Sequence, residues 1–352
     1  MRGDGEGLQI AVVAPLQLPV PPRNAGGTER VIADLIRGVI KRGHNVEFFG
    51  PADSEVPCPI GFPHPSIQAL RAREPRVPGA TGAVLEAALL DAVRTRAHEF
   101  DVIHLHTEFA HAAVLAEHRA RTLTTIHWRT DELDRRLFFE SFPDLPVCAI
   151  SHDQARHVPA SNLAGVVHHG FEAGRYRAGR GAADQLAFLG RMTDQKRPER
   201  AIELARRTGM KLRLAGNLDP GNPAHFERLV RPHLGSGIEH VGEVDDTAKQ
   251  DLLGNAAALV FPVDWPEPFG LVMIEAMACG TPVIGWRNGA VPEVVEDGVT
   301  GFVVDDMEGA VRAVRRLPEI DRALVRQRFE ERFTADRMVE ETLAIYRRLA
   351  AR

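Results

Sequence analysis

Two glutamates, Glu267 and Glu275, lie on either side of a helix start and are the residues of this chain best placed to do chemistry. Pro268 and Gly270 favour a turn into a helix, so the N–H groups of residues 269–272 lack intrahelical acceptors and attract anionic or oxygen-rich ligands. Glu275 falls among core-type residues, where a carboxylate needs a partner. A purely structural role is one explanation, in which both acids pair with Arg or Lys elsewhere in the chain. Their position around a Pro-Phe-Gly helix start favours the other, in which they bind sugar hydroxyls.

The segment that begins at Glu267 also resembles a known family. It reads Glu-Pro-Phe-Gly-Leu-Val-Met-Ile-Glu and continues Ala-Met-Ala-Cys-Gly-Thr-Pro-Val-Ile. This Glu-x7-Glu pattern is similar to the signature of the family 4 (group 1) retaining glycosyltransferases, which use nucleotide sugars and have the GT-B architecture. The resemblance implies an α/β fold with two Rossmann-like parallel-sheet domains facing across a cleft, and a C-terminal helix that crosses back onto the N-terminal domain.

Length and composition fit this expectation. The 352 residues suit two domains, and the net charge of −5 gives no basic surplus for nucleic acid. The first ten residues do not form a signal peptide and no apolar run reaches eighteen residues, so we expect a cytoplasmic protein. Cys58, Cys148 and Cys279 have no CxxC spacing and are expected to be reduced thiols.

The amino-terminal half begins with a strand over residues 8–14, a glycine loop and a helix over residues 31–41. Gly26 and Gly27 would let a phosphate approach the backbone, with Thr28 as the N-cap. A Gly-Gly pair is weak by itself, and the loop is not GxGxxG, which counts against a dinucleotide dehydrogenase. In the family this loop faces the donor diphosphate.

A long irregular loop is expected over residues 52–78, then a helix over 83–99 and a strand over 100–106. His104 and His106 are two apart on that strand and share one face. No further metal ligands are signalled, so both are interpreted as hydrogen-bonded or site-lining histidines, with no role assigned.

His127 stands at the carboxyl end of another strand, over residues 123–127, where open α/β sheets bind ligands. The resemblance implies that it contacts the donor sugar. His169 stands where the family more often has Asn, and it is left unassigned.

Small and polar residues over 173–184 indicate a linker. The predicted domains are residues 1–174, joined by the C-terminal helix from about 334 to 352, and residues 175–333. The resemblance implies that the first is the acceptor-side domain and that the second binds the nucleotide-sugar donor. Strands of the second domain are expected at 186–190, 211–215, 238–241, 257–262, 281–284 and 302–304, and their alternation with helices predicts a parallel sheet.

Arg191 and Lys196 follow the first of these strands and precede a helix at Pro198, so together they would hold a diphosphate and stabilise it as it leaves. Either cation alone would usually be only solvated. Gly190 with Arg191 and Lys196 matches the family's phosphate-binding positions. By the same resemblance, Gly216 lies in a loop on the phosphate and base side, and Val244 ends a segment whose backbone meets the nucleobase.

The resemblance thus implies a retaining hexosyltransferase that moves a sugar from a nucleotide-diphosphate donor to an acceptor hydroxyl. The implied catalytic residues are Glu267, His127, Arg191 and Lys196, and the implied donor-binding residues are Gly26, Gly27, Gly190, Gly216, Val244, Phe269, Gly270, Leu271 and Glu275. Glu267 with the amides of 269–271 would hold the sugar hydroxyls, and Glu275 the ribose. No DxD-type motif is present, so no metal and no other cofactor are expected; the favoured donor is a UDP-sugar.

The acceptor is expected to be a small molecule or a soluble glycan, while a lipid acceptor and peripheral membrane association stay open. Three different activities also remain open: a GT-B nucleotide-sugar epimerase, a phosphorylase, and a protein that binds sugar nucleotides without catalysis. An epimerase would form free epimer from the donor alone, and a phosphorylase would cleave a glycan in a phosphate-dependent reaction. A non-catalytic protein would bind the donor without turnover.

Overall fold

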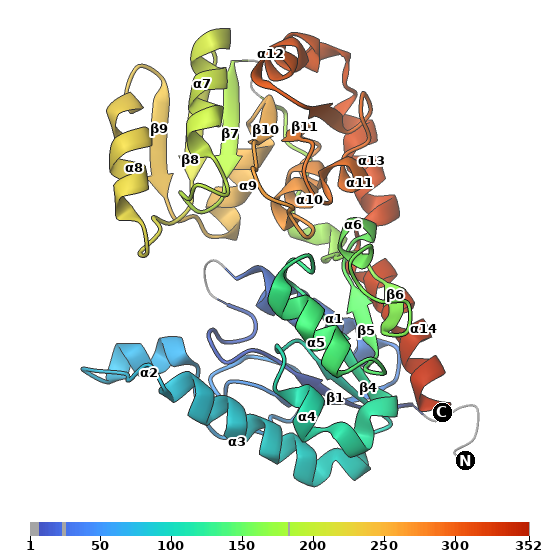
Figure 1. Ribbon diagram of the computed structural model, residues 1–352. Helices are drawn as coiled ribbons and strands as arrows, with labels where there is room; N and C mark the ends of the chain where they lie inside the picture. The colour runs from blue at the N-terminus through green and yellow to red at the C-terminus, as the bar shows by residue number, and fades with distance from the viewer. Residues whose placement is uncertain (1–6, 23–25, 182–183, 352) are drawn as a thin grey trace. The chain divides into compact units, whose positions relative to one another are not determined.

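The computed structural model describes residues 7–22, 26–181 and 184–351. The chain divides into two compact units, one of Met1–Phe171 with Ala335–Arg352 and the other of Glu172–Thr334. Each unit contains one six-stranded sheet in which the neighbouring strands pair in parallel (Figure 1). The predicted α/β class with two parallel sheets is therefore confirmed.

The sheet of the first unit has the order β2-β1-β3-β4-β5-β6. Its strands are β1 (Gln9–Val13), β2 (Asn45–Phe49), β3 (Val102–Leu105), β4 (Thr122–Thr125), β5 (Val147–Ala149) and β6 (Leu163–Val166). Its helices are α1 (Gly27–Lys41), α2 (Ile67–Arg73), α3 (Thr81–Arg96), α4 (His111–Val114), α5 (Leu133–Ser141), α6 (His152–Ala155) and α14 (Ala335–Ala350), with 3-10 turns η1 (Ala97–Glu99) and η2 (Ala116–Arg121). One core cluster joins β1, β3 and α3, and Phe49 meets Phe100 edge to face with centroids 5.7 Å apart.

Helix α14 returns to the first unit and packs on α1 (Figure 1). Gly38 permits this close approach, because a Cβ at that position would lie 2.5 Å from Cγ2 of Val339. Arg42 also donates to a carboxylate oxygen of Asp336 at 2.9 Å. The predicted return of the last helix is confirmed, because α14 belongs to the first unit.

Two local predictions in this unit are wrong. The region 52–78 is not wholly irregular, since it contains α2, which Ser66 caps by accepting from Ala69 N–H at 3.1 Å while donating to Asp53 at 2.8 Å. Thr28 is not the N-cap of α1, because the helix already starts at Gly27, after Gly26.

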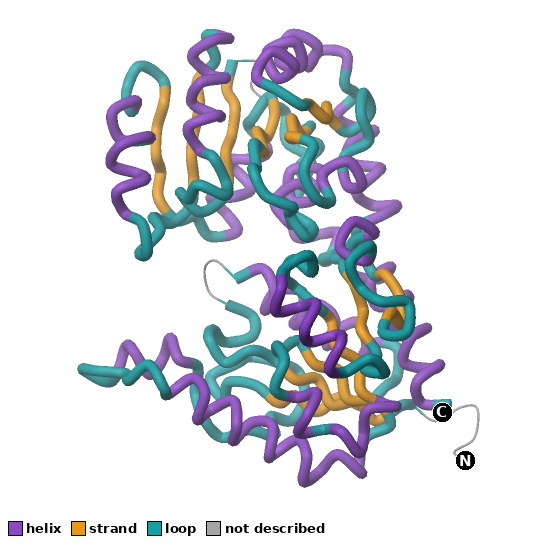
Figure 2. Tube along the Cα trace, viewed as in Figure 1, coloured by secondary structure: helices purple, strands orange, loops and turns teal. Residues whose placement is uncertain are grey.

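The sheet of the second unit has the order β12-β11-β10-β7-β8-β9. Its strands are β7 (Gln185–Leu189), β8 (Lys211–Ala215), β9 (Ile238–Gly242), β10 (Ala258–Phe261), β11 (Val283–Trp286) and β12 (Gly301–Val304). Its helices are α7 (Pro198–Thr208), α8 (Pro223–Leu229), α9 (Asp246–Gly254), α10 (Leu271–Ala278), α11 (Val291–Val294), α12 (Met307–Arg316) and α13 (Arg322–Arg332), with 3-10 turns η3 (Ala173–Arg175), η4 (Arg231–His233) and η5 (Leu317–Glu319). All six strands expected from residue 186 onward are present, and Figure 2 shows strands and helices alternating along this unit.

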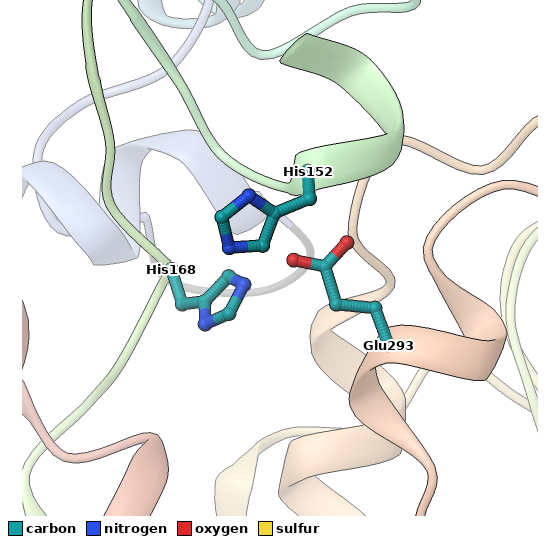
Figure 3. Close-up of side chains that lie close together, drawn as sticks. All are labelled: His152, His168 and Glu293. Carbon is teal, nitrogen blue, oxygen red and sulfur yellow. The ribbon is translucent and has the colours of Figure 1, made fainter. Parts of the chain in front are cut away.

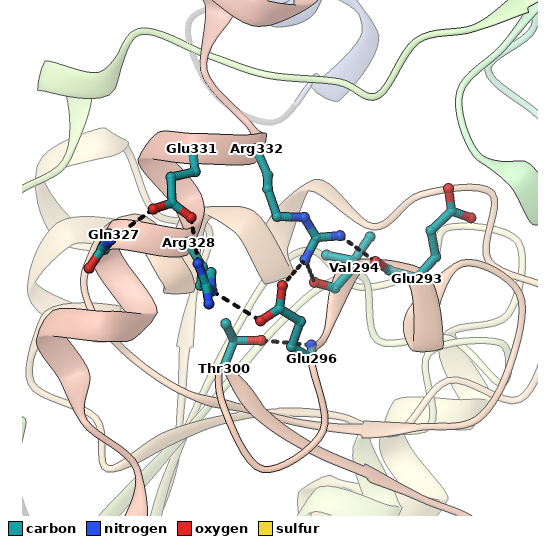
Figure 4. Close-up of polar contacts among 8 residues, drawn as sticks. All are labelled: Glu293, Val294, Glu296, Thr300, Gln327, Arg328, Glu331 and Arg332. Carbon is teal, nitrogen blue, oxygen red and sulfur yellow. Dashed lines mark hydrogen bonds and ion pairs between the residues drawn. The ribbon is translucent and has the colours of Figure 1, made fainter.

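Glu296 ties α13 to the turn after α11, so the end of the second unit is held by ion pairs (Figure 4). Its two carboxylate oxygens accept from Arg328 and Arg332, each at 3.1 Å, while its N–H donates to Thr300 Oγ1 at 2.9 Å. Arg332 also donates to the carbonyl of Glu293 at 2.6 Å. The bond to Glu293 satisfies a carbonyl in the last turn of α11, where carbonyls lack donors within the helix.

Candidate active site

The predicted donor-binding residues of the second unit lie at one edge of its sheet. Gly190, Gly216 and Val244 follow the carboxyl ends of β7, β8 and β9, and Glu267 follows that of β10. These four strands are consecutive neighbours in the sheet, so their following loops share one edge. Ligands of open α/β sheets bind at this edge.

Glu267 and Lys196 form an ion pair at this edge, although they are far apart in the sequence. Their side chains are 10% and 16% exposed, and Glu267 also accepts from Trp265 Nε1 at 2.7 Å. The Lys196 ammonium lies 5.3 Å from the Trp265 ring centroid and 5.5 Å from that of Phe261. The carboxylate predicted to hold sugar hydroxyls and the cation predicted to bind phosphate are thus in contact.

The backbone of Glu267 is held in place by the loop after β11. Gly289 has a φ of +53°, and a Cβ there would lie 2.3 Å from both the N and the O of Glu267. Ala290 N–H donates to the Glu267 carbonyl at 2.9 Å, and the Asn288 amide donates to the Val263 carbonyl at 2.8 Å. Only glycine allows this contact, which explains the Asn-Gly turn found here.

Glu275 has the partner that its burial requires. It is 7% exposed, and its Oε1 accepts from Lys249 Nζ at 2.7 Å. The Tyr176 hydroxyl lies 3.4 Å from the same oxygen and 3.1 Å from Asp246 Oδ1. Lys249 also lies 3.8 Å from Asp246, at the start of α9. The expectation of a partner is confirmed, and α10, apolar on nearly all sides, packs between α9 and α13.

Helix α10 starts as the sequence indicates. Gly270 is its N-cap in the left-handed region, with a φ of +84°, and Leu271 is the first helical residue. The N–H groups of Leu271 and Val272 therefore have no acceptor within the helix. Phe269 is buried against Phe333, with centroids 6.0 Å apart, which fixes the chain just before the helix.

Gly190 and Gly216 touch through their backbones. Gly216 has a φ of +136°, and a Cβ on it would lie 1.9 Å from the Gly190 carbonyl oxygen. This contact gives Gly216 a structural reason to be glycine, apart from any ligand. Arg191, next in the chain, is exposed, and Val244 is half-buried just before α9.

Gly26, Gly27 and His127 belong to the first unit. Gly26 packs against Pro22, whose Cγ would lie 2.7 Å from an added Cβ, and Gly27 is exposed at the start of α1. Asn24 and Ala25 of the predicted glycine loop lie outside the described residues. The contacts of these three site residues with a donor stay predictions.

His127 is part of a group of four histidines at the carboxyl end of the first sheet. His106 Nδ1 lies 2.8 Å from His127 Nε2, and the His127 ring stacks on His169 with centroids 5.2 Å apart. His104 and His106 approach with centroids 4.2 Å apart. Burial lowers the pKa of all four, that of His127 to about 4, so they are neutral at pH 7 and act as hydrogen-bonding groups.

Another histidine pair, His152 and His168, lies in the same unit (Figure 3). His152 is the first residue of α6, and His168 follows β6. Their rings meet edge to face with centroids 5.9 Å apart. Neither residue was assigned a role from the sequence.

A cavity of about 390 Å³ opens beside His106 and His127 in the first unit. It is lined by the loop after β1, by the first turn of α1, by α3 and by the segment after β3. Glu29, Glu86 and Glu108 are its acidic residues. The sequence placed acceptors in this half of the chain but identified none of these side chains.

Two family models match the chain. Residues 25–162 match Glycosyltransferase Family 4 and residues 180–333 match Glycosyl transferases group 1, so the two matches span most of the chain. The chain belongs to the group 1 (family 4) glycosyltransferases. It is accordingly an enzyme, a transferase of the hexosyltransferase type.

Relatives with curated names agree with this assignment. Alpha-maltose-1-phosphate synthase of Mycobacterium tuberculosis (strain ATCC 25618 / H37Rv) is 28% identical over 96% of this chain and 100% of its own length. D-inositol 3-phosphate glycosyltransferase of Mycobacterium bovis (strain BCG / Pasteur 1173P2) is 34% identical over 56% of this chain and 47% of its own length.

Solved structures match over nearly the whole length. AviGT4, a glycosyltransferase involved in avilamycin A biosynthesis, has a TM-score of 0.73 at 24% identity and covers 98% of both chains. Sucrose-phosphate synthase from Thermosynechococcus elongatus has a TM-score of 0.77 at 21% identity, covering 98% of this chain and 99% of its own. The fold of this glycosyltransferase is therefore GT-B.

Sequence reasoning missed several residues around the predicted site. Lys249 and Tyr176 hold Glu275, and Trp265 and Gly289 hold Glu267. The burial expected for Glu275 signalled that a cation was needed, but nothing local selected Lys249 from among the other basic residues. The spacing of residues along a predicted helix does not identify the distant residue that a side chain will contact.

The buried His104 predicts that acid destabilises this glycosyltransferase. Its Nδ1 lies 2.6 Å from the Tyr346 hydroxyl and its Nε2 2.7 Å from Thr125 Oγ1, while burial and, to a smaller extent, His127 lower its pKa to about 3. Below pH 6.5 the unfolded chain takes up a proton there that the folded chain excludes until about pH 3. The free energy of unfolding then falls by about 1.4 kcal/mol per pH unit for this one histidine.

Urea unfolding of the native protein and of His104→Gln, at pH 7, 6 and 5, measures this contribution. We expect the variant to be less stable at pH 7 but to lose less stability on acidification. Glu29 and Glu86, whose pKa values are raised, act in the opposite direction in both proteins and cancel in the comparison. If the free energy of unfolding fell equally with pH in both proteins, the pKa of His104 would not be lowered in the folded state.

Proposed function

We propose that this glycosyltransferase moves a hexosyl group from a nucleoside diphosphate sugar to an acceptor hydroxyl, with retention of anomeric configuration and without a metal ion. The observation that carries the proposal is the pair of carboxylate and lysine contacts, Glu267 with Lys196 and Glu275 with Lys249, at the carboxyl edge of the second sheet. Buried acids and cations placed together at such an edge suit a ligand with both hydroxyl and phosphate groups.

Each group has a role in this proposal. Glu275 accepts hydrogen bonds from the ribose hydroxyls, and Glu267 with the free N–H groups at the start of α10 holds the sugar hydroxyls. Lys196 moves from Glu267 toward the diphosphate, where Arg191 joins it. The two cations and the helix dipole stabilise the negative charge that develops on the leaving group.

The reaction is a balanced group transfer. The acceptor oxygen bonds to the anomeric carbon as the bond from that carbon to the diphosphate oxygen breaks. The acceptor proton passes to the leaving diphosphate, so the products are a glycoside and a nucleoside diphosphate. Retention follows if the acceptor attacks from the face that the diphosphate leaves, which is the family's usual account.

We propose that the donor's nucleotide is UDP. The HepE protein of Anabaena, solved in complex with UDP and glucose, shares the fold at a TM-score of 0.70 and 17% identity over 96% of this chain. The family relationship supports a nucleotide-sugar donor, and this neighbour favours UDP-glucose as the first donor to test. No helix among the described residues has the length and apolar character to cross a membrane.

A screen of UDP-, GDP- and ADP-sugars tests the proposal, with thermal shift for binding and release of nucleoside diphosphate for turnover. We expect one nucleotide class to raise the melting temperature and to be hydrolysed slowly without acceptor, equally well in EDTA. Binding without any turnover would identify a non-catalytic binder. Free epimer would identify an epimerase, and phosphate-dependent glycan cleavage would identify a phosphorylase. Activity lost in EDTA and restored by Mg²⁺ or Mn²⁺ would contradict metal independence.

A further inference from the structure

The cavity of the first unit has the dimensions of a small-molecule site. Its volume of about 390 Å³ falls in the usual range of ligand pockets, and Leu16, Ile67 and Leu89 provide apolar wall. All of its lining residues come from the first unit. One of these lining residues, His127, is also the residue predicted to contact the donor sugar.

The charge of this cavity is negative. Glu29, Glu86 and Glu108 line it, whereas none of the described residues in its lining is Lys or Arg. Burial raises the pKa of Glu29, and burial together with the negative charge of Glu108 raises that of Glu86. Both shifts are in the direction expected for carboxylates that have no ion pair with a described residue.

Only one of the three acids has a cation beside it in the described part of the chain. Arg135 Nη2 lies 3.2 Å from Glu108 Oε2, and Glu29 and Glu86 form no ion pair with any described residue. The histidines of the lining do not supply the charge, because burial lowers the pKa of His106 and His127.

Buried polar atoms in the lining also lack partners. His106 Nε2 and Thr107 Oγ1 are both buried and have no hydrogen-bond partner among residues 7–22, 26–181 and 184–351. The two residues are 4% and 8% exposed. Because buried polar groups are normally satisfied, these atoms point to a hydrogen-bonding ligand and not to an empty acidic surface.

Trp128 adds an aromatic surface to the same cavity. Its side chain is 51% exposed, an unusual state for so large an apolar group, and it follows His127 directly. A tryptophan face beside carboxylates suits both the apolar face of a sugar ring and an ammonium group.

We propose that this cavity binds the acceptor and selects a polyhydroxylated molecule that carries a protonated amine, an amino sugar or an aminocyclitol. This inference rests on the proposed glycosyl transfer and specifies its acceptor. An ammonium compensates Glu29 and Glu86, while hydroxyls meet His106 and Thr107. A neutral polyol leaves the carboxylates without a counter-charge, and a phosphate adds to their repulsion.

Matched acceptors test the proposal. Glucosamine is compared with N-acetylglucosamine, glucose and glucose 6-phosphate, and 2-deoxystreptamine with myo-inositol. Binding is followed by Trp128 fluorescence and calorimetry without donor, and transfer by product formation with the donor found above. We expect the free amines to bind at least tenfold more tightly than their neutral counterparts, and glucose 6-phosphate to bind most weakly.

Two variants locate the selectivity. Glu86→Gln should reduce the preference for amines severalfold while leaving donor hydrolysis without acceptor unchanged. Glu140→Gln, on the exposed side of α5 and outside the cavity lining, is the matched control and should keep the preference.

The possible failures are distinct. Absence of donor hydrolysis would contradict the proposed transfer, whereas binding of the amines would still be measured without donor. Donor hydrolysis combined with equal or weaker binding of every amine than of its neutral counterpart would overturn the amine selectivity alone. Undiminished preference in Glu86→Gln would also overturn it.

Discussion

Replacing Lys196 is expected to lower kcat by about 100- to 1,000-fold, the usual loss when one donor that stabilises a developing negative charge is removed. Its ammonium lies near the carboxylate of Glu267 and over the rings of Phe261 and Trp265, where little water can substitute for it. Because the proposed reaction has no metal ion, the leaving diphosphate depends on Lys196 and Arg191 for positive charge. The effect should therefore appear mainly in kcat, measured as release of nucleoside diphosphate.

The variants separate charge from folding. Lys196→Ala leaves Glu267 with Trp265 as its remaining hydrogen-bond donor, so it should also lower the melting temperature. Lys196→Gln keeps a donor for Glu267 and removes only the charge; it should fold better and remain nearly inactive. Lys211→Ala changes an exposed cation at the start of β8, the opposite edge of the sheet, and should leave kcat unchanged. Turnover within threefold of the native rate in Lys196→Gln would refute the assigned role.

The second large effect is expected at Glu275. Glu275→Ala leaves Lys249, 12% exposed, without its nearest partner, and breaking a buried pair costs about 3 kcal/mol. Asp246, at 3.8 Å, compensates in part. The same change removes the proposed acceptor of the ribose hydroxyls, so nucleotide affinity should fall about 100-fold, since hydrogen bonds to a charged group contribute about 1.5 to 3 kcal/mol each.

A double variant distinguishes the two effects. Replacing both Glu275 and Lys249 by Met removes the charges together, and such replacement of a buried pair is often neutral for stability. We expect its melting temperature to recover most of the loss while nucleotide affinity, measured by calorimetry, stays low. The exposed pair of Asp184 and Lys211 is the control, because its removal should affect neither quantity appreciably. Native-like nucleotide binding by the folded double variant would exclude Glu275 from the donor site.

The amino-acid sequence by itself was enough to determine the architecture. Short apolar runs alternating with amphipathic stretches predicted the strands of the second sheet to within about two residues, because local periodicity controls which face is buried. The start of α10 at Gly270 and Leu271 was also predictable, since proline and glycine act on the backbone within a few residues. The Glu-x7-Glu pattern then placed two acids beside that helix start.

Two local features of the first unit, the helix α2 and the start of α1, were not predicted correctly from the sequence. The helix α2 escaped prediction because its cap depends on Asp53, thirteen residues before Ser66. The start of α1 was predicted wrongly because threonine is a favoured N-cap residue and Thr28 was chosen for that reason. The N-cap is Gly26. For α2, the contact that supports the cap lies outside the stretch of sequence on which the prediction was based.

Only the tertiary structure decided which groups meet. It paired Glu267 with Lys196 and Glu275 with Lys249, and it gathered His104, His106, His127 and His169 from three parts of the chain. It also formed the acidic cavity. The physical reason is that charges and hydrogen bonds act between neighbours in space, whereas the sequence periodicities that predict strands and helices carry no information about which distant residue becomes a neighbour.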